Sequence, residues 1–262
     1  MLICPSTDKS EDANRLKFVS KFKLMQILKK ISLPFTFLFM LIATFSVQAQ
    51  QTDFFDNTQD FLSKYVMDGK VDYESITRNP SSLESLVNQV ARYELKEDDS
   101  DYPFYLNAYN ILVIRSIIDN YPIESPMDVK GFFDGKTHKV AGNRVTLNSL
   151  ENDIIRPTYQ DARIHFALVC GAISCPKLVN TAFTPNNYDA LLTENTKNAI
   201  NDSNFIRLNE GKAWVSKIFE WYMADFGESE AGILEFINQY RSKPLQQNGV
   251  EYYDYDWTLN KL

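Results

Sequence analysis

The stretch that decides the fold is residues 102–120, which read YPFYLNAYNILVIRSIIDN. Apolar residues lie on nearly every side of this segment when it is wound as a helix, which predicts a helix buried on most sides. Its polar members, Asn107, Asn110 and Arg115, must find partners in the interior or face a cleft. We therefore expect the rest of the chain to pack around a central buried helix.

Shorter elements are predicted on both sides of it. Helical spacing of apolar residues predicts helices at 56–67, 187–201, 218–226 and 230–241. Ser81 with Glu84 predicts a capping box for a helix that runs to about Tyr93, and Asn148 with Glu151 predicts an N-cap and its partner for a helix at 149–156. Hairpins are expected at 136–147 and 205–216, and strands at 70–73 and 163–170.

These elements predict an α+β fold. Helices and hairpins interleave without the regular strand–helix alternation of a doubly wound sheet. No stretch is rich enough in Gly, Ser or Pro to be a linker, so residues 50–262 are expected to form one domain. In that domain the central helix would pack on a small mixed or antiparallel sheet.

The composition excludes several classes of partner. The chain has 262 residues, a hydrophobic fraction of 44% and a formal net charge of -7. A nucleic-acid partner is not expected, because phosphate neutralisation needs clustered Lys and Arg. The sequence has no glycine-rich phosphate loop or dinucleotide fingerprint, and its two histidines lack metal-ligand spacing, so no cofactor or metal is predicted.

The N-terminus predicts export. Residues 31–47 carry no charge and follow several lysines. The run stops at Val47, and Gln48 and the small residue Ala49 come directly after it. This order predicts a signal peptide at 1–49, with Met25 as the hypothesised true start, and a periplasmic or secreted protein with no membrane span after cleavage. An uncleaved anchor is the alternative, because the apolar run is near the lower limit for crossing a bilayer. Cleavage would remove Cys4 and leave Cys170 and Cys175 as the two cysteines of the mature chain.

Four blocks of sequence resemble a known family. They are YLNAYN at 105–110, LNSLENDIIR at 147–156, RIHFALVCGAISCP at 163–176 and YDYDWTLN at 253–260. Together, in this order, they are similar to the signature blocks of the domain of unknown function family number 547. The resemblance runs from Phe54 to the C-terminus, and it implies membership and a common site without implying a reaction.

The block at 163–176 holds the candidate reactive residues. On a regular strand His165 and Cys170 would face opposite sides, whereas Cys175 follows a turn that could bring it to His165. Cys175 is therefore the candidate nucleophile and His165 its base, with Asn107 or Glu151 as the orienting group. Tyr109, Asn110 and Arg163 are candidate binding residues.

Each of these residues also has a structural interpretation. Cys170 and Cys175 could form a disulfide outside the cytoplasm, and His165 could be a buried, hydrogen-bonded histidine. Asn107 and Asn110 could bond buried backbone groups, and Glu151 could serve only as a helix-cap partner. His138 is expected at the surface of its hairpin, and the aromatic residues at 252–257 are expected to be a strand packed on the core.

Two functions follow from these alternatives. One is a thiol-dependent hydrolase or acyl transferase that acts outside the cytoplasm on a small-molecule or peptide ligand. Its layout would be similar to that of papain-like and transglutaminase-like cysteine enzymes, although the helix block carries Asn107, Tyr109 and Asn110 where those enzymes place a cysteine. The other is a non-catalytic binding or interaction domain of the cell envelope.

Overall fold

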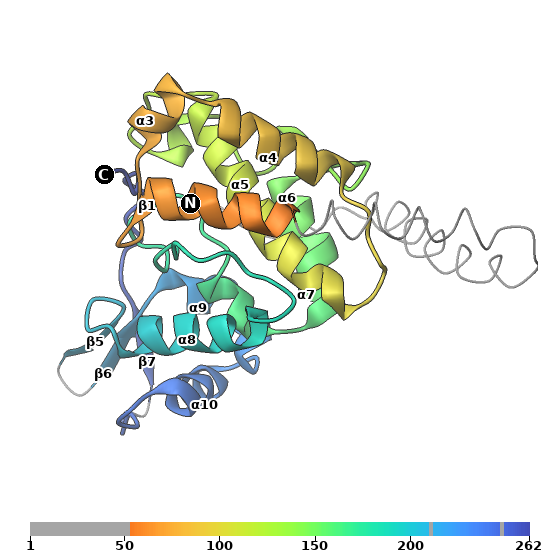
Figure 1. The fold of residues 1–262 in the computed structure, drawn as a ribbon. Coiled ribbons are helices and arrows are strands. Elements are labelled where there is room, and N and C mark those ends of the chain that lie inside the picture. The colour runs from red at the N-terminus through yellow and green to blue at the C-terminus, as the bar shows by residue number, and fades with distance from the viewer. Residues whose placement is uncertain (1–52, 210–211, 247–248) are drawn as a thin grey trace, which may run out of the picture. The chain divides into compact units, whose positions relative to one another are not determined.

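The computed structural model describes residues 53–209, 212–246 and 249–262 (Figure 1). The predicted signal peptide, its cleavage site and the start at Met25 lie outside these residues. In the described ranges, no helix has both the length and the apolar character needed to cross a membrane.

Helix α5, Tyr102–Ile118, is the centre of a first hydrophobic core. Nearly all of its residues are buried, as its apolar sequence predicts. Helices α3, Tyr73–Arg78, and α4, Ser81–Arg92, pack on it (Figure 1). Phe104 at its start stacks on Tyr93 with ring centroids 3.8 Å apart. The helix at residues 53–65 contributes Phe54, whose ring lies 5.4 Å from that of Phe104.

A second core forms around a small mixed sheet. Its strands are β5, Ile206–Asn209, β6, Lys212–Val215, and β7, Val250–Tyr252, in the order β5-β6-β7. β5 and β6 are antiparallel, whereas β6 and β7 are parallel. The helices of this part of the chain are α8, Tyr188–Asn201, α9, Lys217–Trp221, and α10, Glu230–Tyr240 (Figure 1).

The remaining elements are short. They are the hairpin β1, Val66–Met67, with β2, Lys70–Val71; the hairpin β3, Thr137–Val140, with β4, Asn143–Thr146; α6, Leu147–Ser149; a π-helical turn, Leu150–Ile155; α7, Arg156–Tyr159; and 3₁₀ turns at Asp99–Asp101, Pro126–Asp128, Ala162–Phe166 and Met223–Phe226. The turn Ala162–Phe166 joins the cores directly, because Ile164 is buried in the first and Phe166 in the second.

The α+β class and the single domain are confirmed, and so are both predicted hairpins. The strand predicted at 163–170 is wrong: its first part is the 3₁₀ turn Ala162–Phe166, and residues 167–170 lie in no strand. The β-forming residues there pack their side chains into the two cores, but no neighbouring strand pairs with their backbone. A high β-propensity therefore does not produce a ladder.

The predicted helix caps are also wrong. Ser81 is already inside α4, and its hydroxyl donates to Asn79 Oδ1 instead of forming a capping box. Thr146, rather than Asn148, caps α6 by accepting a hydrogen bond from the Ser149 N–H.

The surface position predicted for His138 is also wrong. The side chain is buried, with 8% of its surface exposed, because β3 turns it toward α5, where Ser116 Oγ lies 3.2 Å from its Nε2.

Replacing Phe166 by Ala is expected to lower the free energy of unfolding by about 3–5 kcal/mol. The ring is fully buried and contacts Phe205, Phe219, Phe226 and Phe236, so its loss leaves a cavity at the junction of the cores. Urea denaturation measures the change. Met67→Ala, at a side chain 65% exposed, is the control and should change stability by less than about 0.5 kcal/mol. Equal effects of the two substitutions would contradict this account of the junction.

Candidate functional site

His165 lies between two carboxylates. Its Nε2 is 2.7 Å from Asp225 Oδ2, and its Nδ1 is 4.0 Å from Glu151 Oε1. The imidazole is almost fully buried and stacks on Tyr222 with centroids 4.0 Å apart. The 3₁₀ turn that carries His165 thus presents it to groups from two other parts of the chain, the π-helical turn and the 3₁₀ turn Met223–Phe226.

Asp225 is held in its ionised form. Burial raises its pKa, but hydrogen bonds from His165 and Arg156, together with the charges of both, outweigh burial and place the pKa well below its usual range. Arg156 binds both carboxylate oxygens, with Nε–Oδ2 2.7 Å and Nη2–Oδ1 2.8 Å. Because an ionised carboxylate only accepts hydrogen bonds, Nε2 of His165 carries the hydrogen that it donates to Asp225.

Glu151 is a buried acid held by two tyrosines. The Tyr109 and Tyr222 hydroxyls hydrogen bond to it, and burial followed by the Glu151 charge raises the pKa of both phenols well above the ordinary value. Both phenols therefore stay neutral and donate to the carboxylate. Since Nε2 of His165 donates to Asp225, its Nδ1 is the ring nitrogen that faces the Glu151 carboxylate, at 4.0 Å.

Cys170 and Cys175 form a disulfide. Of the two structures left open by the sequence, the disulfide is therefore the one present. The Tyr255 hydroxyl donates to Cys175 Sγ at 3.0 Å and lies 3.2 Å from Cys170 Sγ. The Cys170 N–H also donates to Cys175 Sγ, at 2.9 Å. Cys175 thus accepts two hydrogen bonds.

Tyr255 connects the sulfur atoms to the acidic cluster. Burial raises the pKa of its phenol well above the ordinary value, with further contributions from Tyr253 and from the charge of Glu151. The same hydroxyl that touches both sulfurs therefore experiences the field of the Glu151 carboxylate. Among the described residues, the hydrogen-bond, ion-pair and ring contacts of the imidazole are with Asp225, Glu151, Tyr222 and Phe226, and none of them is with Cys175.

The two asparagines of α5 bond to backbone. Asn107 Nδ2 donates to the carbonyls of Pro103 and Phe183, at 2.8 and 2.7 Å, and its Oδ1 accepts from the Phe183 N–H. Asn110 Nδ2 donates to Ala167 O and its Oδ1 accepts from Val169 N–H, both at 2.9 Å. Asn107 thus braces the segment at Phe183, whereas Asn110 braces the segment that follows His165.

Arg163 serves a local ion-pair network. Its guanidinium binds Asp161 and Asp189, at 2.7 and 2.8 Å, and Thr193 Oγ1 at 2.8 Å. Side-chain hydrogen bonds with Asp161 are the main reason why the pKa of Arg163 is raised. These contacts tie the 3₁₀ turn of His165 to α8.

Among the residues singled out from the sequence, Tyr109, Glu151 and His165 lie together. Cys175 is hydrogen bonded to Tyr255 instead. Sequence analysis missed Asp225, Arg156 and Tyr222, which contact His165 or its partners. No spacing rule could connect Asp225 with a histidine 60 positions earlier. Tyr255 lies in one of the four quoted blocks, so the sequence did carry a signal for it.

In the part of the chain that the structure describes, no group of three potential metal-binding side chains converges.

Replacing Asp225 by Asn is expected to lower the free energy of unfolding at pH 7 by about 1–3 kcal/mol, because the half-buried Arg156 and the buried His165 lose their acceptor. The folded pKa of Asp225 lies below that of the unfolded chain, so its contribution is present above about pH 4 and is lost as the pH falls further. The stability difference between wild type and variant should therefore shrink from pH 7 to pH 3 in urea denaturation.

The exposed Asp153 provides the matched control for this measurement. Asp153→Asn should change stability by less than about 0.5 kcal/mol at either pH. A difference between wild type and Asp225→Asn that is equally large at pH 3 and pH 7 would contradict the ion-pair account.

Comparison with known proteins identifies a family. The model of the family described as "Protein of unknown function, DUF547" matches residues 93–200, a segment that includes Glu151, His165 and both cysteines of the disulfide. No curated protein and no solved structure matches the chain. The resemblance noted from the four blocks is thus confirmed for that segment, while Asp225 and Tyr255 lie beyond it. Residues 93–200 are thus similar to the DUF547 family, whose function is unknown.

Proposed function

We propose that the chain is a thiol-dependent hydrolase or acyl transferase that acts outside the cytoplasm after a dithiol of that compartment, itself oxidised to a disulfide, has reduced Cys170–Cys175 to two thiols. Cys175 is the nucleophile of this proposal. The observation that carries it is the pair of hydrogen bonds that Cys175 Sγ accepts from the Tyr255 hydroxyl and the Cys170 N–H.

Two donors aimed at one sulfur favour its anionic form. Hydrogen bonds to the charged form of a group lower the pKa of an acid, and the thiolate rather than the thiol is the attacking species. Cys170 Sγ has the Tyr255 hydroxyl as a neighbour at a longer distance, 3.2 Å, so the environment distinguishes the two sulfurs. This asymmetry supports Cys175 over Cys170 as the reactive thiol.

The proposed reaction has two steps. The Cys175 thiolate attacks the carbonyl carbon of an ester or amide, forming a sulfur–carbon bond as the bond to the leaving group breaks. The proton released from the thiol is held by the pair formed by Glu151 and His165 and passes to the leaving group. In the second step water, or the amine or hydroxyl of an acceptor, attacks the thioester and restores the thiol.

Asp225 and Arg156 would be positioning residues in this scheme. Asp225 fixes the His165 tautomer that leaves Nδ1 directed to Glu151, and Arg156 fixes Asp225 by two hydrogen bonds. Tyr109 and Tyr222 orient the Glu151 carboxylate. This arrangement supports a proton-holding role for the cluster, since each member has a defined partner.

A non-catalytic binding or interaction domain of the cell envelope is the second candidate. The observation that favours it is the engagement of Asn107 and Asn110 by backbone groups, which uses them as braces. In such a domain the disulfide would be a structural link. Cys175→Ser and His165→Ala would then lower thermal stability but leave ligand binding unchanged in the folded protein.

Export is part of the proposal and has its own test. N-terminal sequencing of the protein recovered outside the cytoplasm is expected to give Gln50 as the first residue. Signal peptides are cleaved after a small residue, and Ala49 is the small residue that follows the apolar run. Ala49→Arg should block this cleavage, whereas Gln51→Arg is the control with an unchanged site. A recovered protein that begins before Met25 would contradict both the cleavage and the start at Met25.

Reduced protein should react with iodoacetamide at Cys175 about fivefold faster than a free model thiol at pH 7, because a lowered pKa increases the thiolate fraction. Tyr255→Phe should remove most of this enhancement. Tyr252→Phe is the matched control, because the Tyr252 hydroxyl has no hydrogen-bond partner among the described residues. Mass spectrometry of the labelled peptides gives the rates.

Two further measurements separate the candidates. Reduced wild type should release p-nitrophenol from p-nitrophenyl acetate, and Cys175→Ser should lose this activity, while Cys170→Ser should retain it without any reductant. A reduced Cys175 that reacts no faster than the model thiol, with no ester hydrolysis, would leave the binding domain as the better account.

A further inference from the structure

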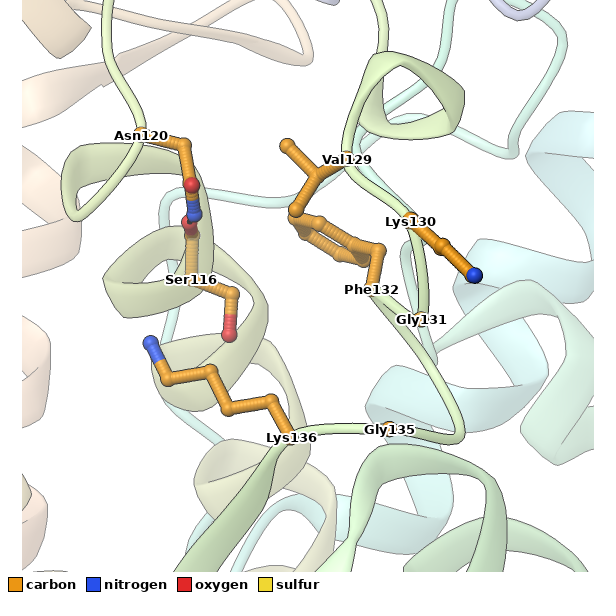
Figure 2. A pocket seen from close by; sticks show the side chains of 8 residues that line it. All are labelled: Ser116, Asn120, Val129, Lys130, Gly131, Phe132, Gly135 and Lys136. Atoms are coloured by element: carbon orange, nitrogen blue, oxygen red, sulfur yellow. Dashed lines mark hydrogen bonds between the residues drawn. The ribbon is translucent and has the colours of Figure 1, made fainter.

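A cavity of about 400 Å³ lies between the last turns of α5 and the loop at 129–136 (Figure 2). Ser116 and Asn120 line it from the helix side, and the loop contributes the remaining lining residues: Val129, Lys130, Gly131, Phe132, Gly135 and Lys136. Its volume is within the range of small-molecule sites. None of these residues takes part in the cluster around His165.

The cavity wall has an excess of positive charge. The ammonium of Lys136 pairs with Asp119 Oδ2, and Arg115 Nε binds Oδ1 of the same carboxylate at 2.8 Å. Two cations therefore share one anion. Lys130 adds a third cation on the loop, and the exposed acids Asp128 and Asp134 lie beside and on it. The lining itself contains two lysines and no acidic residue. A chain with a net charge of -7 thus carries a cavity in which a further anion would be attracted.

Polar groups supplement the cations on one side of the cavity. The Ser116 hydroxyl lies 3.2 Å from His138 Nε2, and Asn120 Nδ2 donates to the Ser116 carbonyl at 2.8 Å. Burial, followed by the charge of Lys136, lowers the pKa of His138 to about 4, so this imidazole is neutral at pH 7. Ser116 and His138 therefore form a neutral polar pair beside the cavity.

The other side of the cavity is apolar. Figure 2 shows the Val129 and Phe132 side chains across from Ser116 and the Lys136 ammonium. The loop that carries them is closed tightly, because the Gly131 carbonyl accepts hydrogen bonds from the N–H groups of Gly135 and Lys136. Gly131 has φ +72°, and a Cβ there would stand 3.1 Å from the Gly135 Cα. These two glycines therefore hold the apolar wall in a fixed position.

We propose that this cavity binds a small organic carboxylate, with the carboxylate between Lys136 and Ser116 and its apolar body against Val129 and Phe132. The carboxylate would meet a lining that contains two lysines and no acidic residue. It also covers apolar side chains at the cavity wall. The site does not use Cys175 and does not rest on the proposed thiol chemistry.

Benzoate and benzamide are suitable probes because they have nearly the same shape and differ in charge. Titration of the full chain, followed by amide NMR signals, should show benzoate shifting Gly131, Gly135 and Lys136. Benzamide should bind about tenfold more weakly, since it lacks the charge that Lys136 recognises. Lys136→Gln should weaken benzoate by a similar factor and leave benzamide unchanged.

Lys139→Gln is the matched control, because Lys139 is an exposed lysine of the same hairpin and does not line the cavity. It should leave both affinities unchanged. Equal affinity for the two probes in the wild type would overturn the proposal even if Lys136→Gln failed to fold, and so would shifts confined to other parts of the chain. Cys175→Ser should bind benzoate normally, which separates this site from the proposed hydrolase.

Discussion

The two hydrogen bonds of the Asn110 side chain determine where the segment between His165 and Cys170 lies. They hold Ala167 O and Val169 N–H against α5, at a distance of 2.9 Å each. His165 precedes this pair of contacts and Cys170 follows it. A side-chain amide thus pairs with backbone where a neighbouring strand would otherwise do so.

A close contact immediately after this segment has the same effect. Gly171 has φ +83°, and a Cβ at this position would stand 2.7 Å from the Ile117 Cδ1. The chain can approach α5 this closely only because glycine has no side chain and tolerates a left-handed conformation. Asn110 and Gly171 together fix the disulfide loop to the same helix that supplies Tyr109 to Glu151.

This constraint explains what the sequence could and could not predict. The apolar pattern of 102–120 and the turn residues of both hairpins act locally, so α5, β3–β4 and β5–β6 were predictable. The segment 163–170 was not, because its conformation depends on Asn110, more than fifty positions earlier. Likewise Glu151 and His165 were found in the quoted blocks, whereas their partner Asp225 lies in a different 3₁₀ turn that only tertiary packing brings close.

The acidic cluster and the disulfide impose opposite requirements on the surroundings of the protein. In the proposed hydrolase, Glu151, His165 and Asp225 would serve a thiol, and Cys175 is a thiol only when the disulfide is reduced. Export, however, leads to compartments in which disulfides persist. A thiol enzyme with this site therefore needs a dithiol reductant in its own compartment, whereas a binding domain needs none. The two candidate functions thus share one fold and differ in the redox chemistry that must accompany it.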